Sequence, residues 1–330
     1  MITLLLGVAY VLWVSRGFLI PFALGGLIAI AFSPLAERIE RSRLGAPWVS
    51  AVLAFLMLGG IVGIVGTIGY LGVLEVSRAY PEYAQRLSEV VDELSQSAGI
   101  SLAERKKLGG DMVLSSESFA LLRRAGASSV GFVTGSALTL LFLFFFVVNR
   151  QTFARKVHQL LVSQGFAEAE ADETLGTIRT TMTRYIWLKT AISAVTGLLF
   201  GLAAWVGGTP FPVFWGFIAF SFNYAPSVGP IIAALVPIVL TLIVVKPFGI
   251  AVGVSLLLGA IQLVSGSMIE PKILGDELDL NIVTAFLALL FWGLVWGPVG
   301  MLLGIPLTAM IQLILRCSRR AAPIAELMGT

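Results

Sequence analysis

The chain has 330 residues, of which 57% are hydrophobic and only 12% are charged, and its mean hydropathy is +0.94. This charged fraction is about half that of ordinary soluble domains, which excludes a soluble globular protein and predicts a polytopic membrane protein. The net charge of +3 comes from loop arginines, so it reports membrane orientation and does not predict nucleic-acid binding.

Cysteine and histidine are too few for the common cofactor and metal sites. The single cysteine, Cys317, excludes an intramolecular disulfide and a multi-cysteine metal site, and the single histidine, His158, excludes a site with paired imidazoles. A serine protease would need a base at membrane depth near Ser255, whereas His158 lies in a charged segment. We therefore expect no cofactor, no metal and no enzymatic activity.

Long charge-free runs predict the membrane segments. Each run could cross a bilayer, since about 20 apolar residues span its hydrocarbon core. The runs are continuously apolar and do not alternate, which excludes a β-barrel and predicts helices that satisfy their own backbone hydrogen bonds. The predicted fold is all-α and spans the membrane several times. The runs are 48–74, 126–148, 190–245, 247–269 and 280–315.

Residues 1–74 are predicted to form the N-terminal membrane spans. Residues 2–33 are apolar apart from Arg16 and are too long for one untilted crossing, so we expect a break at Ser15-Arg16-Gly17. A short basic loop is predicted over 34–47, before a span that ends near residue 74. Glycines recur every three residues in that span, which indicates close helix packing or a bend. They are Gly60, Gly63, Gly66, Gly69 and Gly72.

Residues 75–125 hold 15 charges and are predicted to form an extramembrane helical segment. Apolar side chains recur at helical spacing around Pro81 and predict an amphipathic helix, and Ser101 with Glu104 predicts a capping box for another. We expect the apolar stripe to be buried against the same chain or a second subunit. The stripe consists of Tyr80, Tyr83, Leu87, Val90, Val91 and Leu94.

A single span at 126–148 precedes a second polar block. This block, 149–189, is predicted to form two amphipathic helices separated at Gly165, and the second helix is expected to run directly into the next span. Arg184 and Lys189 are predicted to be interfacial anchors at that junction, because long basic side chains reach from a helix end to the headgroups.

The basic residues predict the orientation. Arginines and lysines concentrate in 34–47, in 149–189 and in the tail that begins at Arg316, and basic loops face the cytoplasm. The three assignments agree if 75–125 is external. Both termini, including the tail 317–330, are therefore predicted to be cytoplasmic.

The C-terminal region, 190–316, is predicted to be the transport part of the membrane domain. Between Thr190 and Leu315 there are six charges, and five of them fall in the window from Glu270 to Asp279. A hydrated interhelical loop is the ordinary interpretation, whereas an acidic group near membrane depth is otherwise kept only when it is paired or functional. In the functional interpretation the ion-coupling residues are Glu270, Lys272, Asp276 and Asp279.

Two long apolar stretches, 211–245 and 282–315, flank this window, and each contains Phe-Trp-Gly, a Gly-Pro and a later proline. At about 50 Å when fully helical, neither stretch fits a bilayer of about 30 Å without tilting or breaking. Paired Gly/Pro-interrupted segments indicate a transporter site, and Gly229-Pro230 and Gly297-Pro298 are the predicted break points. The predicted hinge residues are Pro226, Gly229, Pro230, Gly297, Pro298, Gly300 and Pro306.

Two topologies remain open for these stretches. Single kinked crossings would place the charged window outside, whereas two re-entrant hairpins would enter from opposite sides and place it in the cytoplasm. We favour the hairpins, because opposed hairpins that meet at mid-membrane are what an inverted-repeat transporter needs. Asn223, Tyr224 and Gln262 are polar at membrane depth and are the predicted substrate-binding residues, with interhelical hydrogen bonding as the alternative.

Five motifs are spread over nearly the whole chain: Pro34 with its basic loop, RYIWLK at 184–189, FNYAPSVGPIIA at 222–233, IEPKILG at 269–275 and LALLFWGLVWGPVGMLLGIPLTA at 287–309. Together they resemble the autoinducer-2 exporter family of bacterial permeases. The resemblance implies a multi-pass permease of the inner membrane with about eight membrane segments. It also implies export of small molecules and assembly as a homo-oligomer, with a pentamer as one form. It places the family's motifs on Asn223, Pro226, Gly229, Pro230, Glu270, Pro271, Lys272, Gly275, Gly297, Pro298, Gly300 and Pro306.

Three functions are compatible with these features. The leading hypothesis is a secondary transporter that exports a small molecule of the signalling type by alternating access, since the sequence has no Walker-type nucleotide motif. The first alternative is a Na⁺(Li⁺)/H⁺ antiporter, which some members of the resembled family look like. The second is an oligomeric membrane scaffold or channel with 75–125 as its interaction domain. The expected partners are a small molecule or cation, the lipid bilayer and further copies of the chain, but no nucleic acid.

Overall fold

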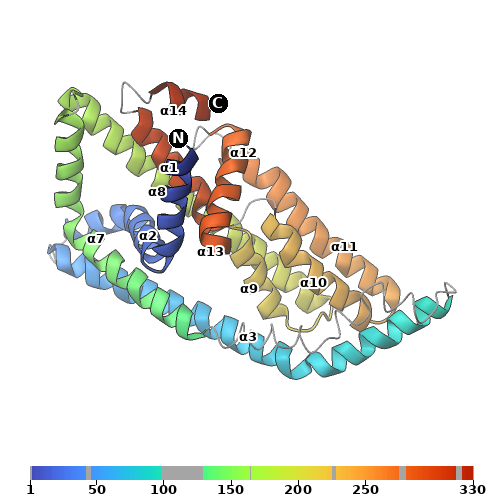
Figure 1. Ribbon diagram of the computed structural model, residues 1–330. Helices are drawn as coiled ribbons and strands as arrows, with labels where there is room; N and C mark the ends of the chain where they lie inside the picture. Colours follow the sequence, from blue (N-terminus) through green and yellow to red (C-terminus); the bar gives the residue numbers. More distant parts are fainter. Residues whose placement is uncertain are drawn as a thin grey trace. The chain divides into compact units, whose positions relative to one another are not determined.

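The computed structural model describes residues 2–41, 46–97, 129–163, 165–224, 228–274, 280–316 and 322–329, and these ranges contain helices and no strand (Figure 1). The prediction of an all-α polytopic membrane protein is confirmed. Within the described ranges, six helices are long and apolar enough to cross a membrane, and two apolar helices are shorter. The total of about eight membrane segments stays a prediction.

The break predicted at Ser15 separates α1 (Ile2–Val14) from α2 (Arg16–Glu40). With 13 residues, α1 is about 20 Å long and too short for a full untilted crossing. The loop predicted from residue 34 is wrong for 34–40, because α2 continues through Pro34 to Glu40. Ion pairs stabilise this polar helix end: Glu40 with Arg150 at 2.5 Å and Glu37 with Arg179 at 2.6 Å.

The third helix, α3 (Pro47–Ser97), has 51 residues and is about 76 Å long, more than twice the thickness of a hydrocarbon core. The amphipathic segment predicted around Pro81 is helical, but it continues the membrane span instead of forming a separate helix. Proline removes one backbone hydrogen bond there. Two residues further on, the ring of Tyr83 packs edge-on against Phe211 with centroids 5.8 Å apart, which holds the continuing helix. The predicted cap at Ser101 and Glu104 lies outside the described residues.

Two more long helices combine a polar end with an apolar end. In α7 (Ser129–Ser163) the apolar part comes first, and in α8 (Glu168–Val206) it comes second. The break predicted at Gly165 is confirmed, and its φ of +97° suits a residue without a Cβ. The prediction that the second amphipathic helix runs directly into the following span is also confirmed by α8.

The first broken stretch is a hairpin of two helices, α9 (Pro212–Phe222) and α10 (Val228–Val244), which pack against each other and lie side by side in Figure 1. With 11 residues, α9 is about 16 Å long and cannot cross a bilayer. Because α9 ends at Phe222 and α10 already begins at Val228, the break point predicted at Gly229-Pro230 is wrong by a few residues. Proline is tolerated in the first turn of a helix, where Pro230 lies, because the first N–H groups have no intrahelical partner.

After the hairpin come α11 (Phe248–Val264), a single π-helical turn η1 (Ser265–Ile269) and the short α12 (Glu270–Leu274). In Figure 1, α11 runs beside α10, against which it packs. Of the charged window, residues 275–279 lie outside the described residues.

The second broken stretch, α13 (Ile282–Arg316), also folds back on itself. Gly297 has φ +68° and ψ −149°, a conformation that interrupts the helix and that glycine adopts most readily. Nε1 of Trp292 donates a 3.1 Å hydrogen bond to the Thr308 hydroxyl, although a straight helix would separate these residues by about 24 Å. The break predicted at Gly297-Pro298 is therefore confirmed, whereas Pro306 lies within the second arm without breaking it.

The arms of α13 approach closely because Gly300 and Gly304 lack side chains. A Cβ on Gly300 would lie 1.9 Å from the carbonyl oxygen of Trp292, and one on Gly304 would lie 3.2 Å from that of Ala288. The chain then ends in α14 (Ala322–Met328), where the carbonyl of Leu327 accepts a 2.8 Å hydrogen bond from Nδ2 of Asn281. Both broken stretches thus fold back as the hairpin topology requires, and their orientation in the bilayer stays a prediction.

The contacts between residues divide the chain into two compact units. The first unit comprises 1–62, 134–191 and 270–330, and the second comprises 63–133 and 192–269. The hairpin of α9 and α10 belongs to the second unit and the hairpin of α13 to the first, so the region predicted over 190–316 is divided between them. Buried core side chains of the first unit include Phe32, Leu143 and Val147, and those of the second include Phe200, Trp215 and Leu258.

Glycines allow the helices of the second unit to pack closely. Gly197 and Gly201 on α8 lie against Gly216 on α9, with a Cβ on Gly197 only 2.7 Å from the Gly216 carbonyl oxygen. Of the regularly spaced glycines of α3, Gly72 faces the ring of Phe214 at a distance that leaves no room for a Cβ. Small residues four positions apart, such as Gly197 and Gly201, are typical of such tight contacts between membrane helices.

Candidate functional site

Five of the uncharged polar side chains that are buried in the second unit lie on neighbouring helix ends and faces, and we call these five the amide–hydroxyl cluster. Two of them lie three residues apart on α8, one follows α9, and two lie three residues apart at the junction of α11 and η1. Residues with this spacing share one face of a helix. The cluster consists of Ser193, Thr196, Asn223, Gln262 and Ser265.

Two hydrogen bonds join the elements that carry this cluster. Nδ2 of Asn223 donates to the Ser193 hydroxyl over 3.2 Å and thereby connects the end of α9 to α8. The hydroxyls of Thr196 and Ser265 are 2.5 Å apart and connect α8 to η1. Since Thr196 donates its proton to the carbonyl of Ile192 at 2.8 Å, Ser265 is the donor in the bond between the hydroxyls.

Three polar atoms of the cluster have no hydrogen-bond partner among the described residues: Nε2 and Oε1 of Gln262 and Oδ1 of Asn223. Gln262 is 3% exposed and Asn223 is 0% exposed. An unpaired buried polar atom costs about 1–3 kcal/mol, so such atoms are normally satisfied by water or a ligand. The free atoms include a donor and two acceptors, which suits a small molecule that both donates and accepts hydrogen bonds.

The π-helical turn η1 sets the position of Ser265 within the cluster. Such turns are rare and occur frequently at functional sites, because they insert one extra residue into a helix and redirect its side chains. Gly266 lies in this turn and faces Pro230 at the start of α10, where an added Cβ would be 3.3 Å from Cγ of the proline. The turn and the first hairpin are therefore in close contact within the second unit.

A buried ion pair lies in the first unit. Nζ of Lys189 on α8 donates to Oε1 of Glu270 on α12, and the two residues are 1% and 9% exposed. Within the described part of the chain, Oε2 of Glu270 has no hydrogen-bond partner. A buried charge is stable only beside an opposite charge, so each residue holds the other in place. The prediction of Lys189 as an interfacial anchor is wrong, because Glu270 offers this ammonium a carboxylate inside the protein.

The remaining predicted site residues lie in different surroundings. The ring of Tyr224 packs edge-on against Phe220 with centroids 5.6 Å apart. Lys272 is exposed and lies two residues after Glu270, so the two side chains do not share a helix face. The ligand and coupling roles predicted for both stay predictions. Three further predicted residues, Pro226, Asp276 and Asp279, lie outside the described residues.

The amino-acid sequence of the chain matches known proteins. A family model described as AI-2E family transporter matches residues 2–320. The chain belongs to this family. It is 28% identical to a Haemophilus influenzae protein named "Putative transport protein", over 98% of this chain and 95% of the relative. It is 29% identical to the AI-2 transport protein TqsA of Escherichia coli K12, over 94% of this chain and 89% of the relative. The resemblance seen in the motifs is confirmed, and the chain is a multi-pass membrane transporter.

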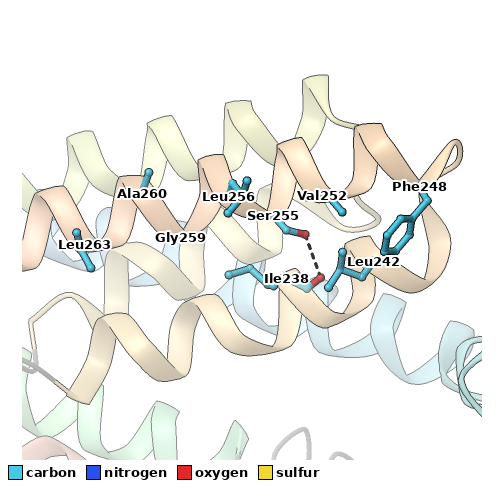
Figure 2. A pocket seen from close by; sticks show the side chains of 9 residues that line it. All are labelled: Ile238, Leu242, Phe248, Val252, Ser255, Leu256, Gly259, Ala260 and Leu263. Carbon is cyan, nitrogen blue, oxygen red and sulfur yellow. Dashed lines mark hydrogen bonds between the residues drawn. The ribbon is translucent and has the colours of Figure 1, made fainter. Parts of the chain in front are cut away.

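This AI-2E family transporter also has an open groove of about 670 Å³ between α10 and α11 (Figure 2). Eight of its nine lining residues are apolar, and the hydroxyl of Ser255 already donates to the carbonyl of Ile238 at 3.4 Å. A polar molecule in this groove would leave its own hydrogen-bonding groups unpaired. The groove is therefore a poorer site for such a molecule than the amide–hydroxyl cluster. Its lining residues are Ile238, Leu242, Phe248, Val252, Ser255, Leu256, Gly259, Ala260 and Leu263.

Sequence reasoning missed four polar residues of this transporter. Ser193, Thr196 and Ser265 gave no signal, because small hydroxyl residues are common in membrane helices and often bond to their own backbone. Lys189 did carry a signal, since it is the last charge before the long charge-free run. Its distance from Glu270 in the sequence, 81 residues, concealed the pairing.

Proposed function

We propose that the chain exports a small, uncharged, polar molecule across the inner membrane by alternating access. The observation that carries this proposal is the amide–hydroxyl cluster, in which Gln262 and Asn223 bury three polar atoms without a partner among the described residues. Burial at this level excludes bulk water, so a bound molecule with hydroxyl or carbonyl groups would recover the hydrogen bonds. Neutral side chains make up the whole cluster, which favours a substrate without net charge.

Autoinducer-2 is the first probe to test, because one relative is named an AI-2 transport protein. In the proposed complex, the Gln262 amide both donates to and accepts from the substrate, and Oδ1 of Asn223 accepts from it. The Ser193 hydroxyl would keep Asn223 in this orientation through the bond it already accepts. Binding would then depend on a few fixed polar groups within an otherwise apolar unit, as in most small-molecule sites.

Alternating access needs two parts that can change their relative position. The two hairpins belong to different compact units, so we propose that the unit containing α9 and α10 moves relative to the unit containing α13. Non-helical backbone at membrane depth is tolerated where it is buried in protein or lines a cavity. Gly297 and the end of α9 at Asn223 would therefore lie at the protein interior.

Reconstitution into liposomes tests the proposal. Purified protein in vesicles loaded with autoinducer-2 should release the probe faster than empty liposomes. The Gln262→Leu variant, which keeps the approximate volume but removes both polar atoms, should lose at least about tenfold of that rate, since each buried hydrogen bond is worth about 1 kcal/mol or more. Ser255→Ala in the apolar groove is the matched control and should keep the wild-type rate. Equal rates in wild type and Gln262→Leu would refute the proposed site.

A Na⁺(Li⁺)/H⁺ antiporter is the second candidate, and it is favoured by the Glu270 carboxylate, whose Oε2 has no partner among the described residues. A carboxylate buried near membrane depth can bind a proton or a cation. If this candidate is correct, a sodium pulse will collapse a preset pH gradient across proteoliposomes. An exporter of an uncharged molecule leaves the gradient intact.

Orientation and assembly complete the proposal. We propose that both termini are cytoplasmic, from the basic residues in 34–47, 149–189 and the tail. We also propose a homo-oligomer. Labelling of a single cysteine introduced at position 276, in a Cys317→Ser background, should come from the cytoplasmic side, and labelling from outside would contradict the orientation. Cross-linking in membranes tests the assembly, and an exclusively monomeric product would contradict it.

A further inference from the structure

The ion pair between Lys189 and Glu270 has a property that a coupling site for an external cation would not have. Its positive member is part of the polypeptide, and it touches the carboxylate directly. The side chains of Lys189 and Glu270 are 2% and 12% exposed, so the pair is a neutral unit largely shielded from solvent. The carboxylate therefore has a resident cation at one of its oxygens.

When a carboxylate couples transport to Na⁺ or H⁺, the bound ion must neutralise the negative charge of the carboxylate. The carboxylate must then release that ion on the other side of the membrane. Lysine cannot be released, because it is covalently attached to α8. Without Lys189, the negative charge of Glu270 would have to be neutralised by another basic residue or by an ion from solution. On α12 itself Lys272 is exposed, whereas the buried ammonium of Lys189 contacts the carboxylate directly.

From this arrangement we propose that Lys189 is the built-in counter-cation of Glu270 and that it makes transport by this chain independent of the sodium and proton gradients. The inference rests on the proposed function, which it deepens by specifying that the neutral substrate moves down its own gradient. The ion pair keeps Glu270 ionised without any ion from solution. It also disfavours the antiporter candidate, since the negative charge that Na⁺ or H⁺ would compensate is already compensated by Lys189.

Removing the lysine charge should convert this chain into a cation-binding one. In Lys189→Met the side chain keeps most of its length and loses its charge, so Glu270 is left buried and uncompensated. Removing one partner of a buried ion pair lowers the equilibrium constant of folding by about a hundredfold or more. Capture of Na⁺ or a proton by the carboxylate would recover much of that lost stability. The Lys189→Met/Glu270→Gln double variant has no charge at the site and should bind neither ion.

The experiment uses the full chain and needs no knowledge of the organic substrate. Equilibrium binding of ²²Na⁺ to purified protein, together with proton uptake reported by a pH-sensitive dye, is measured for wild type and four variants. Wild type and Lys189→Arg should bind neither ion above a liposome control. Lys189→Met should gain at least about tenfold in binding of one of them, and the double variant should lose that gain. Lys156→Met, at an exposed position of α7, is the matched lysine control and should behave as wild type.

Binding of Na⁺ or protons by wild-type protein at Glu270 would overturn the inference, as would a folded Lys189→Met that gains neither ion. If Lys189→Met fails to fold, the wild-type measurement decides, supplemented by autoinducer-2 efflux after both gradients have been dissipated with ionophores. Efflux that stops under these conditions overturns the inference and leaves the substrate site intact. Failure of the proposed function would be recognised separately. In that case the efflux rate of Gln262→Leu would equal that of wild type, whatever the ion-binding measurements show.

Discussion

The hairpin of α13 makes a quantitative prediction at Gly300. A Cβ at this position would lie 1.9 Å from the carbonyl oxygen of Trp292, whereas real Cβ atoms essentially never approach closer than 3.0 Å. In Gly300→Ala the two arms must therefore separate by at least about 1.1 Å. Overpacking of this kind costs about 1–3 kcal/mol, and loss of the hydrogen bond from Trp292 to Thr308 adds about 1 kcal/mol. The higher helix propensity of alanine offsets about 1 kcal/mol of this loss of stability.

The net loss of about 1–3 kcal/mol should lower the unfolding temperature in detergent by about 1.5–4.5 °C, as followed by circular dichroism. Gly253→Ala on α11 is the matched control, because nothing lies within 4 Å of its added Cβ. That variant should be unchanged or slightly stabilised. If Gly300→Ala and Gly253→Ala unfold at the same temperature, the two arms of α13 are not in contact and the second hairpin is wrong.

Further predictions concern stability in the same assay. Gly72→Ala should destabilise the protein by about 1–3 kcal/mol, because its Cβ would meet the facing ring at 2.1 Å, whereas Gly60→Ala on the same helix has open space and should not. Lys189→Met and Glu270→Met should each cost about 3–5 kcal/mol, and the double variant should recover most of that loss, since an apolar pair of similar volume replaces a buried ion pair at little cost. Equal destabilisation by single and double variants would show that the two charges do not interact.

Local chemistry allowed several features to be predicted. Ser15 and Gly165 interrupt apolar or amphipathic periodicity with residues that favour turns, and both mark helix boundaries in the structure. The Gly297-Pro298 pair combines a residue that readily adopts positive φ with one that cannot continue a hydrogen-bonded helix, and the chain folds back there. The motif at 222–233 placed Asn223 beside a break. In each case the residue itself determines the conformation.

Features that depend on tertiary contacts were not predictable in this way. Pro81 was expected to begin a separate helix, but α3 continues through it because the ring of Tyr83 packs against another element. The side chain of Lys189 was expected to reach the headgroups, but a carboxylate far away in the sequence holds it inside. The cluster around Gln262 draws two of its members from a helix whose hydroxyls have no distinctive spacing. Pairing between distant segments decides all three outcomes, and a single sequence does not encode it in a local pattern.

The most direct test of the account is exchange of autoinducer-2 by reconstituted protein. Vesicles are preloaded with the labelled probe, and its efflux is measured with and without unlabelled probe outside, in the absence of any ion gradient. A transporter that alternates around one binding site returns faster when loaded, so external probe should accelerate efflux from wild-type vesicles and should not rescue Gln262→Leu. Efflux that is indifferent to external probe, and equal in wild type and Gln262→Leu, would contradict both alternating access and a substrate site at the amide–hydroxyl cluster.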